Sequence, residues 1–409
     1  MIRYSEKVFH LSEKVIARAC DRRVSPRIPT PVIVKGAVAL FWARLGSLNA
    51  LETVGAAPLW KRWLNRPMAS ADTMGKVYTV LDHDGLRAGI HHVYERLKRN
   101  KALPDIGGLG VAVLDGHESH ASYRRHCSGC LQRTVTTQQG ERIQYYHRNV
   151  TLMLLPGSRP GFKPIRLLLD VESQLPGEGE VATGLRLLKR AIAAYPRAFD
   201  LVLADALYAI VPFFNFLLAR RKHALVVLKD ERRNIHQDVA GLLTLVAPAE
   251  GQYRSRDCWW WDFPDLVSWP EVNTPLRVIR SVETYSVRRQ LDRKLTEETS
   301  EWMWVTTLPR AQASTARAVS LGHQRWDIEN HGFNELVQGW HADHVYKHDA
   351  NAIEAFLLTA FLAYNLFHAF ITLNLKPRGR RGKPEIYRAR LAAAELYAGT
   401  CRFPVGSSP

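Results

Sequence analysis

Three acidic residues in this 409-residue chain, Asp115, Asp205 and Glu329, have the sequence context of a metal-dependent phosphodiester-cleaving site. Apolar runs at 109–114 and 201–204 lead into the two aspartates, and the glutamate lies in a helical stretch. Such runs predict buried strands, whose terminal carboxylates face a crevice at the sheet edge. Two strand-end aspartates and a helix-borne glutamate can hold two Mg²⁺ ions about 3.5–4 Å apart, one for the attacking oxygen and one for the leaving oxygen.

Each aspartate also has a structural interpretation, because a carboxylate at the end of a strand often caps a turn or a short helix. Asp170 and Glu172 form a second strand-end pair, although the neighbouring Pro and Gly favour a turn there. His117 and Glu118 follow Asp115 closely and are candidates to orient a metal ligand through hydrogen bonds. The local context of each acidic residue therefore has to decide which of them carry chemistry.

The context of Glu329 resembles the signature of bacterial insertion-sequence transposases of the DDE type, in the large family numbered four. That signature is Tyr, two residues, Arg, three residues, Glu, six residues and Lys; here Arg325, Trp326, Ile328 and Glu329 match it. The stretch that begins at Asp205 and ends at 229 resembles the second conserved block of that family. Residues 115–118 resemble the first block of one subgroup, and the whole resemblance covers roughly residues 105 to 375.

This resemblance implies a DDE transposase, which cuts DNA at the ends of an insertion sequence and joins the freed 3′-hydroxyl to target DNA. Asp115, Asp205 and Glu329 are then the catalytic residues and the ligands of two Mg²⁺ ions, with Mn²⁺ as the alternative metal. The implied partner is double-stranded DNA, both transposon ends and target, bound by a homodimer. The implied location is the bacterial cytoplasm, in association with the nucleoid and without a membrane partner.

Two positions depart from the family signature, because Gly322 stands at the Tyr position and Leu336 at the Lys position. The resemblance implies that both positions contact DNA near the cleaved bond. The two replacements therefore affect DNA binding and not the metal ligands. On one continuous helix, positions 322, 325, 329 and 336 share a stripe. Arg325 is then expected either to bind a phosphate or to form a salt bridge with a carboxylate. Trp326 is expected either to stack on a DNA base or to belong to the core.

Cys127 and Cys130 have the Cys-x-x-Cys spacing of a zinc site, with His120, His126 and His147 nearby. No second pair of cysteines at this spacing accompanies them, so zinc binding stays open. Three further histidines could share one helix face, but they are expected to be polar surface residues near DNA. They are His341, His344 and His348.

The charge of the chain favours a polyanionic partner, with nucleic acid first and an anionic membrane surface second. Fifty-six Lys+Arg against 39 Asp+Glu give a net charge of +17 and a pI near 9.8. Residues 1–105 carry +9 and residues 376–409 carry +6, so the nearly neutral middle is the part expected to do chemistry. Five cysteines without framework spacing, and an N-terminus without an apolar signal core, indicate a reducing cytoplasm.

The pattern of elements predicts an α/β fold: a ribonuclease-H-like catalytic core with a mostly β insertion and a helical N-terminal domain. In the core we expect strands at 109–115, 131–137, 143–155, 165–171, 200–205 and 224–229, with helices at 179–195 and 212–221. The predicted parts are a helical DNA-binding domain at 1–105, the first part of the core at 106–230, the β insertion at 231–310, the core completion with the catalytic helix at 311–375, and a basic tail at 376–409.

Helices outside the first part of the core are expected at 32–52, at 84–103, at 314–337 and at 350–373, with a further one capped by Ser70 or Asp72. The segment 352–375 is the most apolar, but polar residues interrupt it, so it is expected to be a buried helix and not a membrane span.

Two other functions stay open at this point. One is a catalytically inactive or repurposed DNA-binding protein derived from a transposase, and the other is a ribonuclease-H-like nuclease that cuts without joining. Mg²⁺-dependent strand transfer of a pre-cut DNA end separates these two functions from a transposase.

Overall fold

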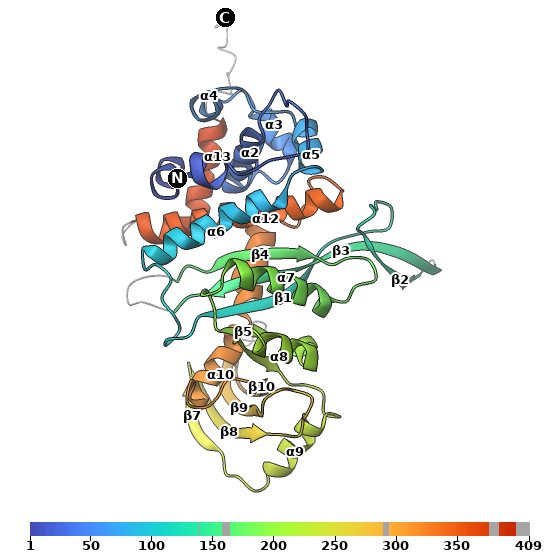
Figure 1. The fold of residues 1–409 in the computed structure, drawn as a ribbon, viewed down its shortest axis with the longest axis vertical. Coiled ribbons are helices and arrows are strands. Elements are labelled where there is room, and N and C mark those ends of the chain that lie inside the picture. Colours follow the sequence, from blue (N-terminus) through green and yellow to red (C-terminus); the bar gives the residue numbers. More distant parts are fainter. Residues whose placement is uncertain (139, 158–163, 289–293, 376–383, 398–409) are drawn as a thin grey trace, which may run out of the picture. The chain divides into compact units, whose positions relative to one another are not determined.

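The protein is α/β, with strands of mixed direction and many helices (Figure 1). This computed structural model describes residues 1–409 except 139, 158–163, 289–293, 376–383 and 398–409. The chain divides into two compact units. Unit 1 contains residues 1–107, 116–196 and 329–409, and unit 2 contains residues 108–115 and 197–328.

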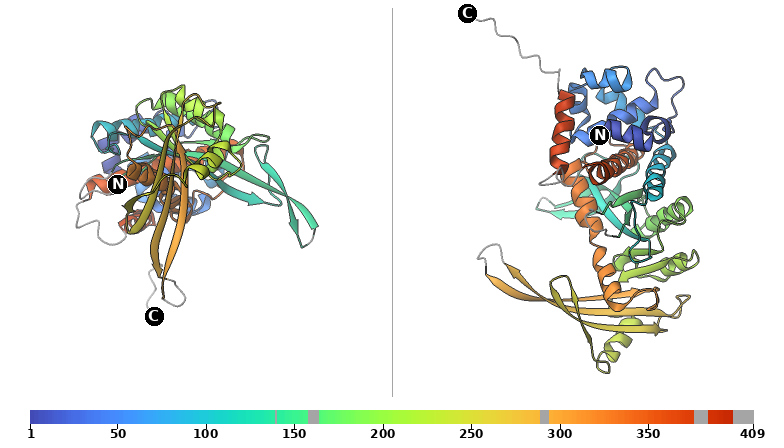
Figure 2. Two further views of the ribbon diagram at one scale, coloured as in Figure 1. Left: turned by 90° about the horizontal axis from the view of Figure 1, so that it is seen from below. Right: turned by 90° about the vertical axis from the view of Figure 1, so that its left-hand side faces the viewer.

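Unit 2 is built on a sheet with the strand order β1-β5-β6-β10-β9-β8-β7. The first three of these strands are parallel and the others antiparallel. Figure 2 shows β9 and β10 as one long hairpin. The strand bounds are β1 Val111–Ser122, which continues into unit 1, β5 Leu201–Ala204, β6 His223–Val227, β7 Ala249–Tyr253, β8 Arg256–Leu266, β9 Leu276–Arg288 and β10 Leu295–Thr306.

Burial explains why the central strands of unit 2 are short apolar runs. All four residues of β5 are buried, as are residues 111–115 of β1, which is typical of parallel strands covered on both faces. Helices of unit 2 pack against this part of the sheet, α8 on β6 and α10 on β5 and β6. The helices are η2 Ala206–Tyr208, α8 Val211–Leu218, α9 Asn234–Leu242 and α10 Thr315–Gln324.

The N-terminal part of unit 1 is helical, as expected, but its helices are shorter than the sequence pattern suggests. The expected helix 32–52 is broken, because Arg44 and Gly46 have positive φ values of 56° and 74°. The side chain of Ser70 caps α5 by accepting a hydrogen bond from the Thr73 amide, as predicted. The helices are α1 Ile2–Phe9, η1 Leu11–Val15, α2 Thr30–Ala43, α3 Leu48–Thr53, α4 Pro58–Leu64, α5 Ala71–Tyr78 and α6 His83–Arg99.

Unit 1 also contains a group of antiparallel strands. β3 (Gly140–Leu155) pairs with β2 (Leu131–Thr137) and with β4 (Leu167–Ser173), and α7 (Glu180–Ala194) packs on β3 and β4. Figure 1 shows β2 and β3 as a long hairpin. These elements lie within a few residues of the expected bounds, because each is marked by local hydrophobic periodicity.

A long apolar helix, α12 (Ala350–Ala369), forms the centre of unit 1. It packs against α2, α6 and β4, and its Asn365 side chain bonds both the amide and the carbonyl of Leu168. The helical stretch Ala350–Asn374 is long and apolar enough to span a membrane by composition, but 94% of its most apolar window is buried. The expectation of a buried helix is therefore confirmed.

In the C-terminal half, the structure agrees with the expected β segment but differs from the expected catalytic helix and basic tail. Residues 231–310 are mostly β, as expected, although β10 pairs with β6 and so extends the core sheet. The expected helix 314–337 is interrupted, since α10 is followed by a turn, by the π-helical segment η3 (Glu329–Phe333) and by α11 (Asn334–Trp340). In the expected basic tail, residues 384–397 form α13, which packs on α2; 376–383 and 398–409 lie outside the described residues.

Candidate functional site

Asp115 and Asp205 occupy matching positions on neighbouring parallel strands of unit 2. The register pairs Val113 of β1 with Leu203 of β5, so two residues further along Asp115 comes beside Asp205. Neighbouring strands lie about 4.7–4.9 Å apart. By this register, Asp115 and Asp205 come just after the last paired residues of the two parallel strands. The expectation that the strand ends at Asp115 is wrong, because β1 continues to Ser122; that the two carboxylates share a metal stays a prediction. Asp115 is 8% exposed and Asp205 is half-buried.

Asp205 also performs the capping role that competed with metal binding. Its Oδ1 accepts a hydrogen bond from the Leu207 amide at 3.0 Å and so caps the 3₁₀ helix η2. A carboxylate has two oxygens and about four acceptor positions. Capping therefore orients Asp205 without using up its capacity to bind a cation.

Arg325 forms an ion pair with Asp115, with 3.4 Å between Arg325 Nη1 and Asp115 Oδ2. The arginine is 6% exposed, and its guanidinium lies 4.2 Å from the ring centre of Trp326. Of the two interpretations of Arg325, the structure thus contains the salt bridge, made with Asp115. Trp326 is 38% exposed, so it is not a core residue, and its contact with a DNA base stays a prediction.

Glu329 is the first residue of η3 and belongs to unit 1. The η3 backbone is held by Tyr364 of α12, whose hydroxyl donates to the His331 carbonyl at 2.7 Å. The chain passes between the units at Asp115–Gly116 and at Ile328–Glu329, so each of these acidic residues adjoins a crossing. The convergence of Glu329 with the two aspartates stays a prediction.

The two departures from the family signature are packing positions. A Cβ on Gly322 would lie 2.4 Å from the indole of Trp304, so α10 passes this tryptophan at a distance that only glycine allows. Leu336 is buried in unit 1 and lines a small cavity with Phe333. The expectation of one helical stripe through 322, 325, 329 and 336 is wrong, because α10 ends at Gln324 and η3 changes the helical register.

The alternative acid pair, Asp170 and Glu172, belongs to a salt-bridge network in unit 1. Both residues lie within β4, and not in the turn that the neighbouring Pro and Gly suggested. Asp170 pairs with Arg87 at 3.0 Å and with Arg190 at 2.7 Å, and Glu172 pairs with Arg190 and with Arg186. These arginines already balance the two carboxylates, so the network stabilises the fold and does not resemble a metal site.

The other residues next to Asp115 in sequence have structural partners. Glu118 forms a bidentate ion pair with Arg133, and His117 stacks on Phe333 with 4.7 Å between ring centres. Burial is the largest influence on His117 and lowers its pKa. Both side chains are thus engaged with partners other than Asp115.

One acidic residue near this region was not singled out from the sequence. Glu180 lies in the first turn of α7, and a Cβ on Gly116 would come within 2.3 Å of its carboxyl group. Glu180 is buried and pairs with Arg148 at 3.3 Å. Its only sequence signal is an acidic side chain at a helix N-terminus, which the helix dipole favours in any protein.

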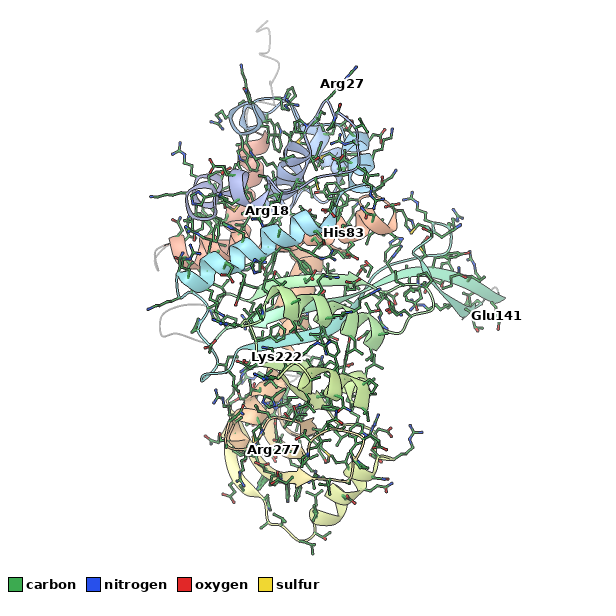
Figure 3. The ribbon with its side chains drawn as sticks, in the orientation of Figure 1. Arg18, Arg27, His83, Glu141, Lys222 and Arg277 are labelled. Atoms are coloured by element: carbon green, nitrogen blue, oxygen red, sulfur yellow. The ribbon has the colours of Figure 1, made fainter. Side chains whose placement is uncertain are left out.

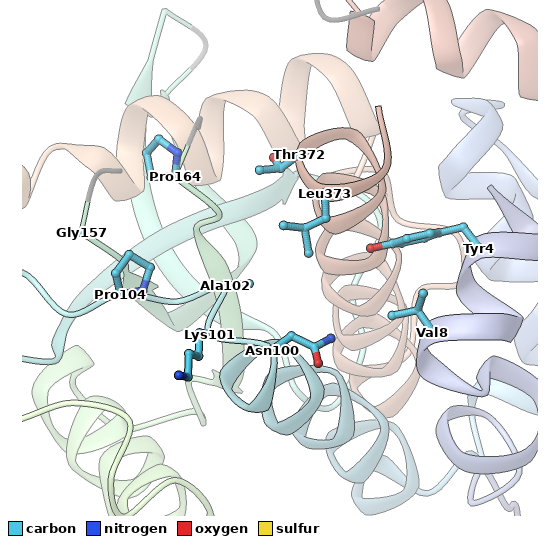
Figure 4. A pocket seen from close by; sticks show the side chains of 10 residues that line it. All are labelled: Tyr4, Val8, Asn100, Lys101, Ala102, Pro104, Gly157, Pro164, Thr372 and Leu373. Carbon is cyan, nitrogen blue, oxygen red and sulfur yellow. The ribbon is translucent and has the colours of Figure 1, made fainter. Parts of the chain in front are cut away.

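A pocket of about 340 Å³ in unit 1 is unrelated to these acidic residues (Figure 4). Its walls include α1, the residues after α6 and the last residues of the helical stretch Ala350–Asn374; Lys101 is the only charged residue among the described residues that line it. The described part of this wall offers no carboxylate for metal-dependent chemistry. The aspartate pair of unit 2 therefore remains the better candidate site.

Residues 166–366 match the family model described as "Transposase DDE domain". The matched segment contains Asp205, Arg325 and Glu329, and it begins after Asp115. This similarity supports a DDE transposase, an enzyme that acts on DNA. Among proteins with curated functions, no sequence matches the chain.

Proposed function

We propose that this protein is a DDE transposase that cleaves the ends of an insertion sequence and transfers the cleaved strand to target DNA. The observation that carries the proposal is the parallel register of β1 and β5, which places Asp115 and Asp205 at matching positions just after the last paired residues. The match of residues 166–366 to a transposase domain supports it independently.

The donor set of the proposed site suits Mg²⁺, which prefers carboxylate oxygens. Asp115 and Asp205 would hold the metal from adjacent strands, and Glu329 would complete the set. When bound, two such ions activate the attacking oxygen and stabilise the leaving oxygen of a phosphodiester. Arg325 supplies a positive charge beside Asp115, so a bound metal would share this carboxylate with the guanidinium.

The order of elements supports a ribonuclease-H-like core. Strands β2, β3 and β4, which pair antiparallel with one another, follow β1 in the chain. Then come α7, β5, α8 and β6, with β5 parallel to β1 and β6 parallel to β5. Carboxylates of such a core lie where the parallel strands end. Asp115 and Asp205 follow the last residues that β1 and β5 pair in parallel.

Double-stranded DNA is the proposed partner, bound by a homodimer, in the cytoplasm with the nucleoid. Residues 1–105 carry a net charge of +9, and Arg18 and Arg27 are exposed on this helical part (Figure 3). Arginine and lysine side chains on such a surface neutralise DNA phosphates. We assign the first contact with transposon ends to this part of unit 1.

The test is Mg²⁺-dependent cleavage and strand transfer on DNA that carries the inverted repeats flanking the gene. Asp205→Asn should abolish both reactions and leave DNA affinity nearly unchanged, because the amide keeps the cap on Leu207 but loses the negative charge. Asp238→Asn, at an exposed position of α9 in the same unit, is the matched control and should remain active. Retained cleavage in Asp205→Asn would contradict the assignment.

The same assay separates the other two functions. Cleavage without joining would identify a nuclease of the same fold. DNA binding without either reaction, in folded wild-type protein supplied with Mg²⁺ or Mn²⁺, would identify a DNA-binding protein derived from a transposase.

A further inference from the structure

A second group of metal-binding side chains lies in unit 1, in residues that the proposed transposase chemistry does not use. Cys127, Cys130, His147 and His348 each direct one ligand atom to a common point, and these four atoms all lie within 4.8 Å of one another. The cysteines come from the loop between β1 and β2, His147 from β3, and His348 from the segment before α12.

The distances within this cluster agree with tetrahedral zinc coordination. Zn–S bonds of about 2.3 Å and Zn–N bonds of about 2.0–2.1 Å place two sulfurs about 3.8 Å apart, and a sulfur and a nitrogen about 3.6 Å apart. The Sγ atoms of Cys127 and Cys130 are 3.8 Å apart. The Nε2 of His147 lies 3.4 Å from Cys127 Sγ and 3.2 Å from Cys130 Sγ, and the Nε2 of His348 lies 3.3 Å from Cys130 Sγ.

We propose that Cys127, Cys130, His147 and His348 bind one structural Zn²⁺ ion. Two thiolates and two imidazoles form a complete four-ligand set, which is typical of structural zinc and leaves no open position for a substrate. Sulfur and imidazole ligands also select against Mg²⁺, so this ion is chemically distinct from those of the carboxylate site.

A disulfide does not explain the cluster. The two sulfurs are separated by 3.8 Å, whereas a disulfide bond requires about 2.05 Å. A cysteine pair with histidines on both sides is instead the arrangement of a closed metal centre. Binding releases one proton from each thiol, and two thiolates then neutralise the two positive charges of the ion.

Two local features fix the loop that carries the cysteine ligands. The Cys127 amide donates a hydrogen bond to Cys130 Sγ at 3.2 Å, which supports a thiolate at that position. Gly129 has no room for a side chain, because its Cβ would lie 2.6 Å from Ala350 Cβ.

Two neighbouring histidines do not belong to the ligand set. His120 stands edge-on to the ring of His348, with 5.4 Å between ring centres, and His126 stacks on Tyr145 at 4.8 Å. Sequence proximity suggested both of them as ligands, but the structure selects His348 instead, 218 residues from Cys130. His120 and His126 therefore serve as natural controls.

The proposed ion would fasten the base of the β2–β3 hairpin to the start of α12. This hairpin and its flanking loop are basic, because residues 123–148 contain five arginines and one glutamate. A zinc ion at the base would fix the direction of this basic ribbon without taking part in catalysis.

The experiment measures metal in the purified full-length protein, prepared without added metal or an affinity tag that binds metal. We expect about one zinc per chain by elemental analysis, and the visible absorption of tetrahedral, thiolate-bound Co²⁺ after exchange with cobalt. Cys130→Ser and His348→Asn should lose the zinc and the cobalt spectrum. His120→Asn and Cys258→Ser, which alter residues outside the cluster, should keep both.

The wild-type measurement keeps the proposal falsifiable even where a ligand variant fails to fold. Folded wild-type protein with less than about a tenth of a zinc per chain, and no cobalt spectrum after incubation with Co²⁺, would overturn the proposal. Full zinc content in folded Cys130→Ser and His348→Asn would overturn it as well. Because the readout is metal content and not strand transfer, it is independent of the proposed transposase activity.

Discussion

At the scale of single residues, Arg325 is bound to Asp115, the carboxylate that would also bind a metal ion of the proposed site. It pairs with Asp115 inside unit 2, where an uncompensated carboxylate would be costly. We expect Arg325→Ala to reduce the free energy of unfolding by about 1.5–3 kcal/mol, the usual value of a hydrogen bond to a charged group. The melting temperature of the purified variant measures this loss.

Mg²⁺ provides the second measurement on this variant. Because the arginine no longer neutralises Asp115, we expect Mg²⁺ to raise the melting temperature of Arg325→Ala by more than that of the parent. Arg325→Lys keeps a positive charge and is the matched control, with a smaller change. An unchanged melting temperature in Arg325→Ala would mean that the pair contributes nothing to stability.

Gly322 yields a prediction that runs against the family signature. Replacing it with Tyr restores the signature, yet a side chain there meets the indole of Trp304. We expect Gly322→Ala to lower stability by about 1–3 kcal/mol, and Gly322→Tyr to lower it further, because overpacking forces neighbours to shift. Gly339→Ala in α11 is the control, since nothing lies within 4 Å of its added Cβ. Improved activity and unchanged stability in Gly322→Tyr would contradict the prediction, because they would mean that Trp304 moves aside at little cost.

At the scale of elements, the interruption after α10 separates the residues that a continuous helix would align. Gly322 and Arg325 stay with unit 2, whereas Glu329 and Leu336 belong to unit 1. The sequence between them keeps helical periodicity, so no local signal marks the turn at 325–326 or the π-helical segment. Long-range hydrogen bonds fix this backbone instead. They include the bond from the Tyr364 hydroxyl to the His331 carbonyl and the bond between His368 and Glu335.

The contact of α6 with α12 predicts a pH dependence of stability. His83 pairs with Glu354 at 3.1 Å, and Glu354 also pairs with Arg87. Burial lowers the pKa of His83, but the hydrogen bond and charge of Glu354 outweigh it and raise the pKa above 6.5. Burial raises the pKa of Glu354, but its partners, His83 first, bring it down to about 2.

The signs of these two shifts define a window. The His83 contribution is fully present below pH 6.5 and is lost as pH rises through the raised pKa of the folded protein. The Glu354 contribution is present above pH 4.5 and is lost as pH falls toward 2. We expect His83→Gln to remove part of the fall in melting temperature above pH 6.5. The exposed His10→Asn is the control, and an unchanged profile in His83→Gln would contradict the network.

At the scale of the whole molecule, the sequence predicts local secondary structure but not the contacts between residues that are far apart in the chain. The apolar runs that lead into Asp115 and Asp205 predicted buried strands, but β1 continues past Asp115 to Ser122. The parallel pairing of β1 with β5 brings together strands that are separated in the chain by β2, β3, β4 and α7. The ion pair of Asp115 with Arg325 joins residues 210 positions apart, and the Cys130–His348 contact joins residues 218 apart. No single-sequence periodicity carries such information, so these contacts appear only in the folded chain.

The distribution of charge supports a last prediction, on DNA binding by the full chain. The helices of residues 1–105 pack on α12 and α13 within unit 1, so the intact protein is the proper sample. Arg18, Arg27 and Lys61 are exposed on this part. Each basic side chain that binds a phosphate releases counterions, which adds about 0.9 to the slope of log affinity against log salt.

Replacing all three with Gln should therefore weaken duplex binding at low salt and reduce that slope by up to about 2.7, or about 0.9 for each lost phosphate contact. Titrations of a duplex at several salt concentrations measure the slope. Asp205→Asn is the matched control, since it changes a carboxylate of the proposed catalytic edge and should leave the slope as in the parent. An unchanged slope in the triple variant would show that the N-terminal helices do not hold DNA. The excess charge there would then serve solubility, and the basic β2–β3 hairpin would become the first surface to test.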